Sequence, residues 1–301
     1  MIRKPWEIHL VILTFVAAFL VGAAADADAQ DVRPELERVY RSWISANVNK
    51  NFSAWKRHTA AHRYASTRNM VVSRKDKWPD VIFTLPFSAP DIVTLRHLAT
   101  LQDGPTAHLI YFGKIDFGID LEEGQEVPEN ILMLRFVKEG LYWKFDNTRF
   151  FNLGKDEGLL RMARIGDSDL LADDRFRPNG IVPEAPALIG PPDYAGDIWV
   201  ASIGYEVEIK IGEHHRTIIG NNVITEMVMG GLSRAGHEIE VEIREIEIPE
   251  DVERRLEIEI YALRQPKPAA RVWAWKPDEE FDLTKGYKSK VWANAVTIPG
   301  G

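Results

Sequence analysis

Apolar and charged residues alternate strictly over much of the C-terminal third of the chain. The alternation is clearest in residues 205–211, 238–243 and 256–260, where the polar positions are mostly glutamates. Successive side chains of an extended strand point to opposite faces, so each segment predicts a strand with one apolar and one acidic face. Further short runs rich in β-branched and aromatic residues bring the total to about seven strands, a pattern typical of a sandwich. We therefore expect an all-β sandwich domain over residues 197–301.

A second group of predicted strands lies near the middle of the chain. Residues 108–119, 130–137 and 141–153 are rich in β-branched and aromatic residues and are bounded by turn-forming segments. Gly140 tolerates the positive φ of a tight hairpin between the second and third runs. The charged segment 120–130 predicts a solvated loop between the first and second. We expect an antiparallel meander with one apolar face and one face that is wet or lines a cavity.

Two helices are predicted ahead of this meander. Pro34 suits the first turn of a helix, and the apolar residues that follow recur at the spacing of one helical face. Asn51 or Ser53 can cap a second helix that runs through Trp55 towards Thr67. Helices followed by a meander indicate an α+β fold.

The order of these elements, with the segment from Glu139 to Asp146, resembles the NTF2-like superfamily. That resemblance implies helices folded against a curved antiparallel sheet, forming a cone with an internal pocket over residues 31–155. The superfamily includes isomerases, hydrolases, dehydratases and non-catalytic domains, so the fold alone does not select a function. Residues 224–238 resemble a strand-turn-strand piece of galactose-binding-like and immunoglobulin-like sandwiches, which implies an accessory or binding module for the C-terminal domain.

Residues 156–196 have the composition of a connection between the two domains. A short helical piece at Leu159–Arg164 leads into an acidic stretch and then into a segment that contains five prolines. Clustered prolines exclude helix and inner strand and favour a stiff, extended spacer. The sequence therefore predicts a proline-rich linker. The five prolines are Pro178, Pro183, Pro186, Pro191 and Pro192.

The N-terminus has the organisation of an export signal. Arg3 and Lys4 precede an apolar run over residues 8–25, and Ala27 and Ala29 form a small-residue site before Gln30. We expect residues 1–29 to be a cleaved signal peptide, which indicates a periplasmic or secreted protein of a bacterial envelope. The alternative is an uncleaved anchor, because about 18 apolar residues can just span a bilayer. The chain contains no cysteine, so no disulfide stabilises it.

Charge and motifs limit the classes of partner. The net charge is −8, and it becomes −7 when residues 1–29 are removed, so the chain lacks the basic footprint of a nucleic-acid-binding protein. No membrane contact is expected beyond the signal segment. Phosphate loops, nucleophile elbows and dinucleotide fingerprints do not occur, and we expect no cofactor. His58 and His62 are four residues apart on the predicted second helix but lack the glutamate of a zinc hydrolase, so no metal is expected.

Four charged residues on the predicted meander are the candidates for a site in the first domain. Asp116 and Asp146 could act as acid or base, and Arg135 or Lys144 could stabilise negative charge. The alternative is that these residues only solvate an exposed sheet face.

In the second domain, Trp273 and Trp275 share a strand face and could stack against a sugar, with core packing as the alternative. Two functional hypotheses result. The preferred one is a non-catalytic exported protein that binds a carbohydrate, a peptide or an envelope protein. The other is an NTF2-like pocket enzyme of the isomerase, hydrolase or dehydratase type, with the sandwich as an accessory module.

Overall fold

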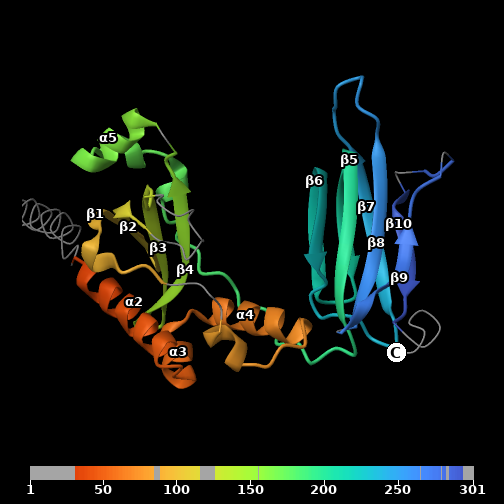
Figure 1. Cartoon of the computed structure of the whole chain (residues 1–301), viewed down its shortest axis with the longest axis horizontal. Coiled ribbons are helices and arrows are strands. Elements are labelled where there is room, and N and C mark those ends of the chain that lie inside the picture. The colour runs from red at the N-terminus through yellow and green to blue at the C-terminus, as the bar shows by residue number, and fades with distance from the viewer. Residues whose placement is uncertain are drawn as a thin grey trace, which may run out of the picture.

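The computed structural model describes residues 31–84, 89–115, 126–154, 156–264, 266–278, 280–282 and 285–293 (Figure 1). Helices and antiparallel strands form separate parts of it, so the fold is α+β. The predicted signal peptide lies outside the described residues. No helix in the described part of the chain has an apolar stretch of the length needed to cross a bilayer.

In the described part of the chain, three helices precede the first sheet. Helix α2 (Arg33–Val48) has Pro34 in its first turn, as predicted, and buries Leu36 and Tyr40. The other helices are α3 (Phe52–His58), α4 (Ala61–Ser73) and, after the first sheet, α5 (Glu157–Ile165). Short 3₁₀ turns are η1 (Asp80–Phe83), η2 (Ile92–Thr94), η3 (Ser168–Leu171) and η4 (Asp174–Phe176).

The second predicted helix is divided into α3 and α4. Asn51 caps α3 as expected, accepting a hydrogen bond from the amide of Ala54 at 3.0 Å. At Thr59 and Ala60 the chain leaves the helical path, because the amide of Ala60 donates to the carbonyl of Phe145 at 2.8 Å. This backbone pairing at the sheet edge replaces helical hydrogen bonds. The prediction of one continuous helix was therefore wrong, and His58 and His62 lie on different helices.

The first sheet is an antiparallel meander in the order β1-β2-β3-β4. Gly140, in the turn between the last two strands, has φ +60°, as the hairpin prediction required. The strands are β1 (Arg96–Asp103), β2 (Thr106–Lys114), β3 (Glu129–Glu139) and β4 (Tyr142–Asn152).

Both faces of this sheet are covered. Helix α2 packs on one face, where Leu109, Leu134 and Phe145 are buried. The opposite face, expected to be wet or to line a cavity, is covered by residues that the sequence assigned to the linker. These residues are Leu160 and Ala163 of α5 and Phe176 of η4.

The linker predicted for residues 156–196 is therefore shorter in the structure. Asp156 caps α5 by accepting hydrogen bonds from the amides of Gly158 and Leu159, and Gly166 ends the helix with φ +77°. The acidic and proline-rich composition indicated a linker, although a few apolar residues in this segment pack it against the first sheet. Only residues 177–193 run without helix or strand, as the prolines predict.

The second sheet has six strands in one hydrogen-bonded network, ordered β10-β7-β5-β8-β9, with β6 also paired to β5. The first half of β5 pairs with β8 and its second half with β7. Gly204, with φ +77°, lies between the two halves. The strands are β5 (Ala195–Ile211), β6 (His215–Met227), β7 (His237–Glu245), β8 (Arg255–Arg264), β9 (Lys267–Trp275) and β10 (Tyr287–Val291).

The predicted apolar faces of these strands meet in one core. Val207, Ile209 and Ile258 are fully buried there, which confirms the inward face of the alternation. Trp275 of β9 stacks on Tyr287 of β10 with ring centroids 4.4 Å apart. Because β9 and β10 are the two ends of the strand order, the sheet wraps around its own core.

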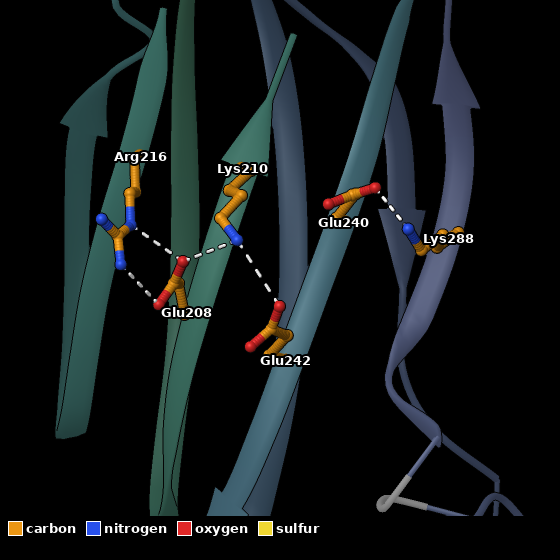
Figure 2. Close-up of polar contacts among 6 residues, drawn as sticks. All are labelled: Glu208, Lys210, Arg216, Glu240, Glu242 and Lys288. Carbon is orange, nitrogen blue, oxygen red and sulfur yellow. Dashed lines mark hydrogen bonds and ion pairs between the residues drawn. The ribbon is translucent and has the colours of Figure 1, made fainter. Parts of the chain in front are cut away.

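The outward face of the second sheet is charged but balanced. Figure 2 shows Glu208 between Arg216 and Lys210, at 2.8 and 2.9 Å, with Lys210 also 3.4 Å from Glu242. Glu240 pairs with Lys288 across the β7–β10 boundary. The sequence predicted acidic outer faces, and in the structure basic residues on the same and neighbouring strands neutralise much of that acidity.

Helix α4 lies between the two sheets (Figure 1). Ser73 at its end accepts a hydrogen bond from the amide of Gly230, at 2.8 Å. Asn69 donates to the carbonyl of Ala187 at 2.8 Å and accepts from the amide of Ile189 at 3.0 Å. One helix therefore holds the connecting segment and the second sheet against the first part of the chain.

Candidate functional site

The candidate site is built around a bulge in β4. Arg135 pairs with Asn147 and Phe136 pairs with Phe145, so Asp146 is the extra residue between them. A bulge turns a side chain out of the regular alternation of the strand. Asp146 is 4% exposed, so a carboxylate predicted for a wet face is buried instead.

Two basic side chains flank the Asp146 carboxylate. His62 Nε2 lies 2.7 Å from Oδ1, and Arg135 Nε lies 3.9 Å from Oδ2. His62 comes from the first turn of α4, where Glu139 accepts a hydrogen bond from the amide of Ala61 at 2.6 Å. A buried carboxylate needs such partners, because burial without them costs several kcal/mol. The sequence identified Arg135 and Asp146 as candidates, and the structure brings them together.

The role of His62 was missed by sequence reasoning. His62 and Asp146 are 84 positions apart, and the only signal, the spacing to His58, suggested a metal instead. The bond to Asp146 places the proton of a neutral imidazole on Nε2, a tautomer inferred from the hydrogen bond. His62 Nδ1 is then a buried acceptor, and it has no partner among the described residues.

Asp146 lines a cavity of about 390 Å³ between the helices and β4. Trp43 is fixed at its wall, since its indole N–H donates to Thr59 Oγ1 at 3.1 Å and its ring lies 4.5 Å from that of Phe145. Asn147 Oδ1 is buried without a hydrogen-bond partner in the described residues. The apolar lining consists of Trp43, Trp55, Ile82, Phe145 and Phe150, and the polar lining of Asn47, Thr59, Arg63, Thr67, Asp146, Asn147 and Thr148.

The other two candidates of the first domain are Lys144 and Asp116. Lys144 Nζ donates to the carbonyl of Arg57 at the end of α3 and does not line the cavity. Asp116 lies outside the described residues. The histidine nearest to Lys144 in this region is His58, whose pKa is lowered by burial and by the positive charges of Lys144 and Arg57.

The two candidate tryptophans of the second domain pack on its core. Trp273 and Trp275 are half-buried and contact Tyr287, and Trp275 also lies 5.3 Å from Phe281. This arrangement favours the core-packing alternative over an open sugar-stacking surface. Among the described residues, no group of three or more histidine and acidic side chains could hold a metal ion.

No protein-family model, curated protein or solved structure matches this chain. The chemistry of the site follows from its side chains. Aromatic and aliphatic walls with a few fixed polar groups are typical of small-molecule sites. Here the fixed groups are the buried carboxyl of Asp146 and the amide oxygen of Asn147, which has no partner in the described part of the chain.

Proposed function

We propose that this chain is an exported, two-domain ligand-binding protein of the bacterial cell envelope. In this proposal the N-terminal domain binds a small hydroxylated ring compound, such as a sugar, in the cavity at the β4 bulge. The observation that carries it is a cavity that Asp146 and Asn147 line together with Trp43 and Trp55, with the amide oxygen of Asn147 lacking a partner among the described residues. Sugar hydroxyls donate hydrogen bonds, and the C–H faces of sugar rings pack on tryptophan.

We also propose a fold for each of the two domains. An NTF2-like cone for the first domain is supported by the order of helices and meander and by a cavity between them. A sandwich for the second domain is supported by β5, whose halves pair with different strands around one core. Export is supported by the basic start, apolar run and small-residue site of residues 1–29.

The test is a binding screen of the whole chain against monosaccharides and disaccharides, read by ligand-observed NMR. We expect one class of sugar to bind, and Asn147→Ala to weaken that binding by about tenfold, the effect of losing one good hydrogen bond. Asn130→Ala is the matched control. Its Oδ1 is also buried without a partner in the described residues, but Asn130 does not line the cavity.

Failure of every sugar would reject the carbohydrate proposal. A peptide or an envelope protein would then be the class of partner to test, by crosslinking in isolated envelopes. Equal binding by wild type and Asn147→Ala would show that the ligand lies elsewhere.

A second function, acid-base catalysis, is favoured by one observation. The Asp146 carboxylate orients the His62 imidazole at 2.7 Å and leaves Nδ1 without a partner among the described residues. A carboxylate orients a catalytic histidine base in the same way. His62 does not line the cavity, however, so binding is better supported than catalysis. If a bound sugar is converted by the wild type but not by His62→Gln, the enzyme hypothesis replaces the binding one.

A further inference from the structure

A second cavity, of about 480 Å³, lies where the end of α4 meets the second sheet. Its walls come from separate segments of the chain: the residues after α4, Tyr194 with the first residue of β5, and the end of β8 with Pro266 and the start of β9. The lining residues are Arg74, Lys75, Asp76, Tyr194, Ala195, Leu263, Arg264, Pro266 and Lys267.

The lining carries four basic side chains and one acidic side chain. This excess of positive charge stands against a net charge of −8 for the whole chain. Like charges that converge in one cavity repel one another, and their convergence is relieved by an anion bound between them. Among the described residues, neither Arg74 nor Lys75 forms an ion pair with a carboxylate.

The conformation of Lys75 brings its side chain to this cavity. Lys75 has φ +63°, in the left-handed region that favours glycine and that other residues adopt at an energetic cost. Its Nζ donates to the carbonyl of Asp193 at 2.6 Å and lies 6.0 Å from the centre of the Tyr194 ring. Tyr194 is held from its other side by Arg234, which donates to the phenol oxygen at 3.2 Å.

We propose that this basic cavity is a binding site for a phosphate-bearing small molecule. The guanidinium group of Arg74 offers a planar set of donors suited to phosphate oxygens, and Lys75 and Lys267 supply point charges. The cavity is larger than one phosphate group, so an organic phosphate fits it better than the free ion. The ligand would contact both α4 and the second sheet, and so would strengthen the junction between the two domains.

The test is isothermal titration calorimetry of the whole chain with inorganic pyrophosphate as the probe. We expect binding that weakens as salt increases, because the contacts are between charges. Arg74→Gln and Lys75→Gly should each reduce the affinity by about tenfold or more, the effect of one charge-assisted hydrogen bond. Lys75→Gly also removes the left-handed strain, so loss of folding does not explain its effect.

Lys50→Gly is the matched control. Lys50 is also a lysine with positive φ, +53°, after a helix, and it does not line this cavity. It should bind pyrophosphate as the wild type does. A second titration uses phosphatidylcholine vesicles with and without phosphatidylglycerol. Binding to the anionic vesicles alone, lost in Arg74→Gln and Lys75→Gly, would identify a lipid phosphate as the source. No binding to either probe, or binding unchanged in both variants, would overturn the proposal.

Discussion

The two sheets of this protein differ in where their charged side chains lie. In the second sheet most charged residues lie on the outward face, where Glu208, Lys210 and Arg216 pair across strands (Figure 2). In the first sheet Asp146 is buried and is held by His62 and Arg135. Surface pairs contribute little to stability, whereas buried charges are costly unless they are paired. The difference suggests that the second sheet is built for stability, while the first accepts a cost beside a cavity.

Among changes to charged residues, removal of the buried carboxylate should have the largest effect on stability. Asp146→Ala leaves the His62 N–H without its acceptor and the Arg135 guanidinium without its negative partner, and we expect a loss of about 3 kcal/mol in the free energy of unfolding. This is the low end of the range for buried pairs, because a quarter of the Arg135 side chain remains exposed. The measurement is urea denaturation at neutral pH, with sugar binding measured on the same variant.

Ile258→Ala separates loss of stability from loss of the site. Ile258 is fully buried in the second core, so truncation should cost about 2–5 kcal/mol and leave sugar binding intact. If Asp146→Ala unfolds at the same urea concentration as the wild type, the buried group of Asp146, His62 and Arg135 does not affect stability. The contrast between the two sheets is then lost.

The same contrast explains how much the sequence could predict. In the second sheet the apolar positions recur with period two, so the burial of Val207, Ile209 and Ile258 followed from the pattern alone. One face of each strand packs on the core and the other faces water. The alternation of apolar and polar residues is therefore sufficient to predict which residues are buried.

The first domain depends on contacts between distant residues. The bulge at Asp146 leaves no mark in the sequence, and the division between α3 and α4 arises because Ala60 pairs with Phe145 across the sheet edge. Asp146 and Arg135 were recognised as candidates from their residue types, but His62 joins them only through folding. Sequence periodicity predicts which face of a helix or strand is buried, whereas this site brings together residues that are far apart in the chain.

A further prediction concerns His215, a buried polar residue of the second domain. Its Nδ1 accepts a hydrogen bond from the amide of Met229 at 3.2 Å, and burial lowers its pKa while Glu226 raises it in part. A lowered pKa means that the unfolded chain binds the proton first as pH falls. The contribution of His215 to the free energy of unfolding is therefore complete above pH 6.5, its ordinary pKa. It is lost as the pH falls through the lowered pKa.

His215→Asn should reduce this dependence on pH, since the asparagine oxygen can accept the Met229 hydrogen bond without titrating. His214→Asn, at the exposed neighbouring position, is the control and should behave as the wild type does. Part of the dependence should remain in both variants, because burial also lowers the pKa of His108. The measurement is the urea midpoint at pH values on either side of 6.5. Identical slopes in wild type and His215→Asn would show that this histidine does not carry the effect.

The smallest effect should come from the outward face of the second sheet. Hydrogen bonds from Arg216 and Lys210 lower the pKa of Glu208 to about 2, so its contribution to stability is present above pH 4.5 and is lost as pH falls through about 2. Because Glu208 lies on the outward face of the sheet and its side chain still reaches water, water and salt screen the pairing. Glu208→Gln should lower the urea midpoint slightly at neutral pH and low salt, and should match the wild type at high salt. Glu213→Gln is the control, since Glu213 is exposed and forms no ion pair among the described residues. A loss as large as that of Asp146→Ala, or one that salt does not reduce, would mean that the outer charges are structural and would remove the contrast between the two sheets.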